Sequence, residues 1–277
     1  MALTTTLSRY AAAILAAASL TGCGVASAAA LPPSASPTTS APTVEPSPVP
    51  TATPAPIPSP APLPTPDPTT DPAPANGRYC SVADVLTPNT SFDDHAATYL
   101  DWTHRLPADY VPPDLVNAVT GNPAAGARLA IRALAYGDLA RLRAAALAAG
   151  HRLDIVSAYR SYQQQAQTFD YWTRVAGYDQ ALNTSARAGH SEHQLGTAID
   201  FGDGSAAPWE YTDWAQTPAG AWLASHAADF GFVMSYPRGR SDVTCYSYEP
   251  WHYRYVGTTL ARALVASGLS LREYQSV

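Results

Sequence analysis

The chain has 277 residues and a formal net charge of -6, and 14% of its residues are charged. The basic residues are scattered singly along the sequence, so no basic patch is available for nucleic acid, and we expect no such partner. All 16 basic residues are arginines. This excludes mechanisms that depend on a lysine, including Schiff-base chemistry and the Ser-x-x-Lys pair of serine-type penicillin-binding enzymes.

The first 30 residues have the layout of a secretory signal. Arg9 precedes an apolar stretch from Tyr10 to Leu20 that is too short to span a bilayer. The sequence Leu-Thr-Gly-Cys at residues 20–23 resembles a bacterial lipobox, which predicts a signal peptide of residues 1–22 and lipid attachment at Cys23. Ordinary cleavage after Ala28 is the alternative. We therefore expect an exported protein, either a lipoprotein on the outer face of the cell membrane or one secreted to the cell wall.

A proline-rich segment occupies residues 23–75. Most of the prolines of the chain lie between Pro32 and Pro74, where they alternate with serine, threonine and alanine. Such a composition favours extended polyproline II and cannot bury a core. At about 3.1 Å per residue, the part from residue 31 to residue 75, some 45 residues, reaches on the order of 140 Å. We predict a disordered tether between a lipid anchor and a single folded domain of residues 76–277.

Cys80 and Cys245 are the two cysteines of the predicted domain. In an oxidising compartment an even number of cysteines indicates a disulfide, and this one would close a long loop. The loop-entropy model gives about 5 kcal/mol as the upper figure for its stabilisation. Two buried free cysteines are the alternative.

Hydrophobic spacing predicts mixed secondary structure in the domain. A helix is expected over residues 138–149, ended by Gly150, and a strand over residues 152–157. A second helix is expected to begin near Ser161. Its apolar stripe includes Gln165, a polar residue that needs a partner.

The C-terminal part of the domain shows further helix signals. Thr217 and Pro218 are typical of a helix start, and Gly231 is expected to end that helix. A short strand over residues 232–236 follows, and a last helix is expected to begin at Thr258.

Two short stretches carry the side chains suited to chemistry. Residues 191–200 read Ser-Glu-His-Gln-Leu-Gly-Thr-Ala-Ile-Asp, and residues 249–252 read Glu-Pro-Trp-His. A catalytic zinc site needs three ligands from His, Asp or Glu, one open position, and a nearby carboxylate that accepts a proton. The two stretches together meet that requirement, although each alone is a weak signal.

The pattern Ser-x-His-x-x-Gly-x-Ala-x-Asp followed by Glu-x-x-His resembles the VanY D-alanyl-D-alanine carboxypeptidases and related LAS-type peptidoglycan metallopeptidases. Residues 106–113, 157–162 and 249–256 add to the resemblance, which spans roughly residues 98–260. It implies an α+β fold in which a small antiparallel sheet is flanked by helices, with a zinc cleft beside the sheet.

The resemblance also implies roles for individual residues. His193, Asp200 and His252 are the implied ligands of Zn2+. Glu249 is the implied general base for a zinc-bound water that attacks the peptide bond.

Three further residues match family positions near the substrate. Arg160 is expected either to stabilise the oxyanion or to clamp the terminal carboxylate of the substrate, and a structural salt bridge is the alternative. Ser191 and Gln165 are expected to bind the peptide. The other histidines, His190 among them, are interpreted as structural or surface residues.

The function that the resemblance implies is removal of the terminal D-alanine from peptidoglycan stem peptides ending in D-Ala-D-Ala. We expect the protein to be a monomer. L,D-carboxypeptidases and peptidoglycan endopeptidases of the same family share this metal site and differ in pocket shape. A catalytically silent cell-wall-binding module is the alternative from another class. A serine or cysteine hydrolase would need a base beside its nucleophile, and the sequence suggests no such pair.

Overall fold

The computed structural model describes residues 80–124 and 129–276. The predicted signal peptide, the lipidation site Cys23 and the proline-rich tether lie outside the described residues. Within the described part, no helix is both long enough and apolar enough to cross a membrane.

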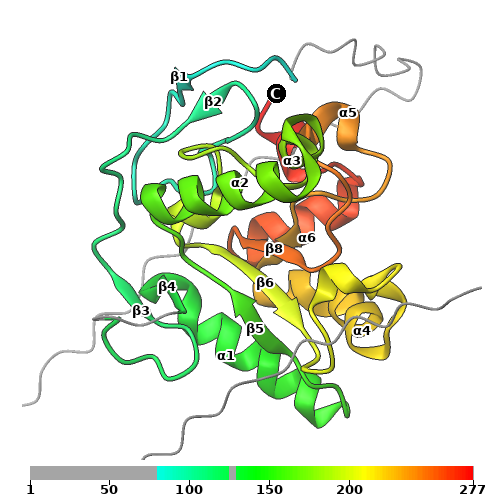
Figure 1. Cartoon of the computed structure of the whole chain (residues 1–277). Coiled ribbons are helices and arrows are strands. Elements are labelled where there is room, and N and C mark those ends of the chain that lie inside the picture. The colour runs from blue at the N-terminus through cyan, green and yellow to red at the C-terminus, as the bar shows by residue number, and fades with distance from the viewer. Residues whose placement is uncertain (1–79, 125–128, 277) are drawn as a thin grey trace, which may run out of the picture. The chain divides into compact units, whose positions relative to one another are not determined.

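A four-stranded antiparallel sheet forms the centre of the fold (Figure 1). Its strands lie in the order β5 (Asp154–Ser157), β6 (Ala198–Gly202), β8 (His252–Tyr255) and β7 (Phe232–Met234). Every neighbouring pair is antiparallel. The α+β class with a small antiparallel sheet, expected from the sequence, is confirmed.

The main core lies on one face of this sheet, which is covered by helices α1 (Ala133–Ala148) and α4 (Pro218–His226) (Figure 1). Side chains alternate between the two faces of a strand, so every second residue of β6 and β8 enters this core. The sheet and helix residues that meet there include Ile199, Phe201, Tyr253, Tyr255, Leu139, Leu142 and Leu223. Each fully buried leucine contributes about 1.5–3 kcal/mol of hydrophobic stabilisation.

Helices α2 (Tyr162–Ala176) and α3 (Tyr178–Thr184) lie on the other side of the sheet (Figure 1). Ser161 begins α2 with a capping box, in which its hydroxyl accepts from Gln164 N and its own N–H donates to Gln164 Oε1. Gln165 is the buried residue of α2, and its Nε2 donates to Ala186 O at 2.6 Å. The polar residue on the predicted apolar stripe therefore has a partner.

Some boundaries differ from those predicted. Helix α1 begins at Ala133, five residues before the predicted start. The chain from α4 to Gly231 is a helix followed by the 3-10 turn η4 (Ala227–Phe230). Helix α6 (Thr258–Ser267) begins where expected. It is not the last helix, because α7 (Leu271–Tyr274) follows it.

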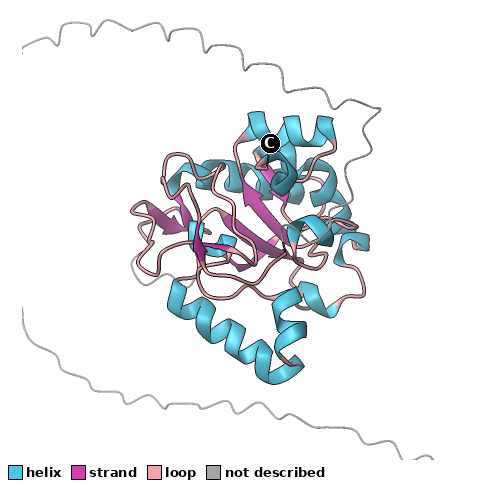
Figure 2. Cartoon of the chain, turned by 90° about the horizontal axis from the view of Figure 1, so that it is seen from above, coloured by secondary structure: helices cyan, strands magenta, loops and turns pink. Residues whose placement is uncertain are grey.

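The remaining elements are short. Strands β1 and β2 pair in parallel, and β3 and β4 form an antiparallel pair. Their bounds, with those of the remaining helical turns, are β1 Val85–Leu86, β2 His104–Arg105, β3 Leu115–Asn117, β4 Ala130–Arg132, η1 Glu192–Leu195, η2 Pro208–Glu210, η3 Trp214–Gln216 and α5 Ser241–Thr244. Seen from above in Figure 2, the strands in the middle of the molecule lie among helices, while short strands lie at one edge beside loops.

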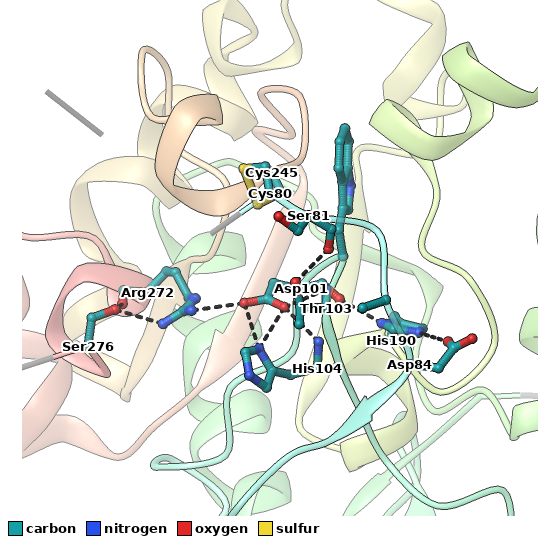
Figure 3. A network of polar contacts seen from close by, with 12 residues as sticks. Cys80, Ser81, Asp84, Asp101, Thr103, His104, His190, Cys245, Arg272 and Ser276 are labelled. Carbon is teal, nitrogen blue, oxygen red and sulfur yellow. Dashed lines mark hydrogen bonds and ion pairs between the residues drawn. A yellow bond between two sulfur atoms is a disulfide. The ribbon is translucent and has the colours of Figure 1, made fainter. Parts of the chain in front are cut away.

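A polar network holds the N-terminal segment of the described part against the rest of the domain (Figure 3). Asp101 is fully buried and accepts a hydrogen bond from Arg272 Nη2 at 2.8 Å. His190 lies between Asp101 O at 2.7 Å and Asp84 Oδ1 at 2.9 Å. The structural role predicted for His190 fits these contacts, which fasten the segment just before Ser191.

The predicted disulfide between Cys80 and Cys245 is present (Figure 3). It joins the first described residue to the end of α5. Replacing both cysteines with serine should lower the free energy of unfolding by about 2–5 kcal/mol, because the unfolded chain loses a long-range constraint. Urea unfolding of the oxidised wild type and the double variant measures this difference. Reduced wild type should resemble the variant, and equal midpoints for all three would contradict the prediction.

Candidate metal centre and active-site cleft

The register of the sheet brings Asp200 and His252 together. In the antiparallel pair of β6 and β8, Asp200 lies directly opposite His252. Their strand neighbours Ile199 and Tyr253 enter the core. By the alternation of side chains, Asp200 and His252 therefore point to the opposite face of the sheet, toward α2.

His193 reaches the same place from the 3-10 turn η1. Gly196 ends this turn in the left-handed region at φ 72°. A Cβ atom at Gly196 would lie 3.0 Å from the side chains of Arg132 and Leu115, so both the conformation and the space favour glycine. The chain then enters β6, which places His193 Nε2 3.2 Å from Asp200 Oδ2.

His193, Asp200 and His252 form a group that fits a metal ion. They are buried, and one ligand atom from each lies within 4.8 Å of the others. His193 Nδ1 donates to Ala158 O at 2.7 Å. Its buried Nε2 lies near Asp200 but makes no hydrogen bond of good geometry among the described residues. His252 Nδ1 lies 2.9 Å from Asp200 Oδ1. Two imidazoles and a carboxylate are a donor set that zinc favours.

The electrostatics of the three groups are coupled. Burial, assisted by the Arg160 guanidinium, lowers the pKa of His193 to about 4. Burial alone would raise the pKa of Asp200, but His193 and His252 hold it well below its usual range. Burial opposes protonation of His252, yet Asp200 and Glu192 raise its pKa to about 10. Because a ligand must be deprotonated to bind metal, zinc binding here would release a proton.

The pKa values of two glutamates near this group are shifted in opposite directions. Burial raises the pKa of Glu249 to about 8, and Glu249 lines the cleft described below. Burial would also raise the pKa of Glu192, but Arg254 and His252 lower it to about 2. Glu192 is not one of the described residues that line the cleft. Glu249 is therefore the carboxyl group suited to proton transfer.

A cleft of about 640 Å³ opens above the three candidate ligands. Helices α2 and α3 form one wall, and the segment from Tyr246 to Trp251 contributes to the other. This volume is large enough for a peptide longer than two residues. Its lining includes His193, Asp200, His252, Glu249, Arg160, Ser191, Thr168, Trp172, Trp209 and Tyr236.

Of the three residues predicted to contact the substrate, Arg160 and Ser191 line the cleft, whereas Gln165 is not among the described residues that line it. Arg160 lines the cleft with Nη2 4.0 Å from Asp200 Oδ2, and its buried Nε has no hydrogen-bond partner among the described residues. Ser191 also lines the cleft, where its hydroxyl accepts from His193 N and caps η1. Gln165 is not among the described lining residues. Its Nε2 donates to Ala186 O, and its buried Oε1 has no hydrogen-bond partner in the described part of the chain.

Several residues of the site are not evident from the sequence. Tyr236 stacks on His252, with 4.9 Å between ring centroids, and Ser235 and Arg254 contact Glu192. Arg254 offered one signal, because it lies two residues after His252 and so shares its face of the strand. Ser235 and Tyr236 had none.

Comparison with known proteins agrees with this geometry. Residues 128–258 match the family profile described as VanY: D-alanyl-D-alanine carboxypeptidase. The chain is 35% identical over 173 residues to "Putative carboxypeptidase YodJ" of Bacillus subtilis, covering 62% of this chain and 63% of that protein. It is 37% identical over 163 residues to a D-alanyl-D-alanine carboxypeptidase of Enterococcus faecalis, covering 54% and 56%. The chain thus spans somewhat less than two thirds of these relatives.

Solved structures show the same fold. The LdcB LD-carboxypeptidase matches with a TM-score of 0.55 and 32% identity, covering 65% of this chain and 86% of that chain. A VanY D,D-pentapeptidase variant from a VanB-type resistance cassette, solved in complex with Zn(II), matches with a TM-score of 0.55 and 28% identity, covering 65% and 98%.

Proposed function

Since the chain belongs to the VanY family, we propose that it is a zinc-dependent carboxypeptidase that releases the terminal D-alanine from peptidoglycan stem peptides ending in D-Ala-D-Ala. The observation that carries this proposal is the cluster of His193, Asp200 and His252 at the bottom of a cleft that also presents Glu249. The zinc-bound structural relative and the D-alanyl-D-alanine carboxypeptidase of Enterococcus faecalis support it.

The chain's own residues account for the ligand set and the proton transfers. Zinc held by His193, Asp200 and His252 would supply a Lewis acid that polarises the attacked carbonyl and makes water nucleophilic near neutral pH. Glu249 accepts the proton of the attacking water and returns it to the leaving amine of D-alanine. Burial raises the pKa of Glu249 to about 8, which suits both steps, and a bound zinc ion would bring that value closer to neutrality.

Arg160 supplies positive charge to the cleft. Burial lowers the pKa of this guanidinium, while Asp200 and Glu249 favour its charged form. Its Nε, which has no hydrogen-bond partner among the residues that the structure describes, can donate to the substrate, either to the carbonyl oxygen that becomes negative or to the terminal carboxylate.

Arg160→Ala should therefore lower kcat/KM by about 10²–10³-fold, the loss typical of one oxyanion donor. A fall in kcat identifies the oxyanion role, whereas a rise in KM at constant kcat identifies the carboxylate clamp. Steady-state kinetics of D-alanine release measures the two parameters. Arg174→Ala, on the exposed side of α2, is the control. Wild-type kinetics in Arg160→Ala would show that the residue serves neither role.

The choice of bond is tested by the choice of peptide. The relatives include both a D-alanyl-D-alanine carboxypeptidase and an LD-carboxypeptidase. The purified protein should release D-alanine from stem pentapeptide, and a chelator should abolish the release. Release from tetrapeptide alone would identify an L,D-carboxypeptidase. Zinc binding without release from either peptide would favour an endopeptidase or a silent wall-binding module.

We also propose that the protein is exported and works as a monomer held to the outer face of the cell membrane by a lipid on Cys23. The proline-rich tether would give its domain reach into the cell wall. In cells, Cys23→Ser should move the protein from the membrane fraction to the soluble or secreted fraction, because a lipid chain is then absent. Immunoblots of the two fractions measure the change. Unchanged membrane association would favour cleavage after Ala28 and another means of retention.

A further inference from the structure

A buried polar cluster lies behind His252, away from the cleft. Its centre is the Glu192 carboxylate, which is 5% exposed. Glu192 Oε2 accepts from His252 Nε2 at 3.0 Å and from Ser235 Oγ at 2.5 Å. Glu192 Oε1 accepts from Arg254 Nη1 at 2.8 Å. Both carboxylate oxygens therefore accept hydrogen bonds from protein donors, and Glu192 is not among the described residues that line the cleft.

Arg254 anchors this carboxylate to a distant part of the chain. Its side chain is fully buried, and Nη2 donates to the backbone carbonyls of Thr98, at 2.7 Å, and His95. A buried guanidinium is costly unless it is paired and hydrogen-bonded. Glu192 supplies its countercharge, and the segment around Thr98 fixes its position. These contacts hold the Glu192 carboxylate and the Arg254 guanidinium in one defined arrangement.

The chemistry of imidazole makes the contact with Glu192 directional. A neutral imidazole carries its proton on one ring nitrogen and a lone pair on the other. An ionised carboxylate only accepts hydrogen bonds, so Glu192 selects the form of His252 with a proton on Nε2. In the metal-free protein Nδ1 faces Asp200 Oδ1 at 2.9 Å, within hydrogen-bond distance. Release of the Nδ1 proton on metal binding would leave the lone pair on Nδ1, because Glu192 keeps the other proton on Nε2. On the other ligand, Ala158 O selects the proton position on His193 Nδ1 in the same way.

We propose that Glu192, held by Arg254 and Ser235, is a positioning residue that orients His252 and selects its tautomer for metal binding. This inference rests on the proposed zinc site. Glu192 acts through His252, in contrast to Glu249, which lines the cleft and would contact the reacting water. The two glutamates therefore affect different properties, namely metal affinity and catalytic rate.

The test compares Glu192→Gln with wild type in the full-length protein. The substitution keeps the size of the side chain but removes its charge and one acceptor, so zinc should bind about 10- to 100-fold more weakly. Competition with a chromophoric chelator measures this dissociation constant without reference to activity. At saturating zinc the variant should regain most of the wild-type kcat. The exposed Glu210→Gln is the matched control and should keep wild-type affinity.

A second readout follows the tautomer itself. Long-range ¹H–¹⁵N spectra of the zinc-loaded wild type should show His252 protonated at Nε2, and the variant should show a shifted or mixed pattern. If Glu192→Gln fails to fold, Ser235→Ala replaces it, because this change removes one donor and leaves the pair of Glu192 and Arg254 intact. Ser235→Ala should weaken zinc binding several-fold, with Ser225→Ala on the exposed side of α4 as its control.

Wild-type zinc affinity and an unchanged His252 spectrum in Glu192→Gln, or in Ser235→Ala where the first variant does not fold, would overturn the positioning role. A loss of kcat that persists at saturating zinc with normal affinity would also overturn it, since that result assigns Glu192 a catalytic role. If wild type itself binds no zinc, the proposed function fails first, and the positioning role falls with it. The wild-type measurement thus separates the two failures.

Discussion

Glu249→Gln lowers the rate of D-alanine release by about 10²–10⁴-fold, the range typical of a lost general acid–base group, while zinc stays bound. The substitution keeps the shape of the side chain and removes its ability to take a proton. Glu249 lines the cleft and is not one of the three clustered candidate ligands, so the metal site should remain intact. Steady-state kinetics and zinc content of the same preparation measure the two properties.

The pH profile should report the same group. Because Glu249 acts as a base when deprotonated, kcat/KM should fall as the pH drops through its pKa. Burial raises this pKa to about 8 in the metal-free protein, and a bound cation would lower it. The acid limb should therefore lie below that value and disappear in the residual activity of Glu249→Gln. Near-wild-type activity in this variant would remove Glu249 from the mechanism.

Asp200→Asn should weaken zinc binding by more than the 10- to 100-fold expected for a residue that only orients a metal ligand. The substitution is nearly isosteric, but it removes the anionic ligand between the two histidines. D-alanine release should fall in parallel and recover only at high zinc concentration. Zinc content after gel filtration and the dissociation constant measure the effect.

Asp203→Asn is the matched control for this variant. Asp203 follows the same strand and accepts a hydrogen bond from Tyr211 OH, outside the described cleft lining. It should keep wild-type zinc content and activity. A full equivalent of zinc in Asp200→Asn would mean that the metal lies elsewhere.

The candidate ligands were predictable because their residue types sit in short motifs with flanking matches. Their mutual placement was not, because it depends on the register of β6 against β8. That register pairs Asp200 with His252, 52 residues apart in the sequence. Long-range strand pairing is set by the packing of a whole face, which no local pattern encodes.

The hydrogen-bond partners of the residues around the candidate ligands also could not be predicted from the sequence. Glu192 stood inside the recognised motif, yet its partner Arg254 lies 62 residues away, and the carbonyls that hold Arg254 come from a third segment. Gln165 fell on the predicted stripe of α2, but its hydrogen bond to Ala186 O turns it into a structural contact. Such side-chain partners follow from tertiary packing rather than from spacing.

The sequence around α7 carries a local signal other than hydrophobic periodicity. Helix α7 is too short for a hydrophobic period to reveal it. Ser270 and Glu273 nevertheless form a capping box whose Ser-x-x-Glu spacing is visible in the sequence. The early start of α1 had no such signal, because Arg132 precedes it without a side-chain cap.

The most direct test of a zinc enzyme at this site is a titration of the metal-free, full-length protein with zinc while D-alanine release from stem pentapeptide is followed. The site of His193, Asp200 and His252 predicts no release without metal and a linear rise that ends at one equivalent of zinc per chain. Full activity in the metal-free protein, or a rise that continues well beyond one equivalent, would contradict a single catalytic zinc held by these three residues.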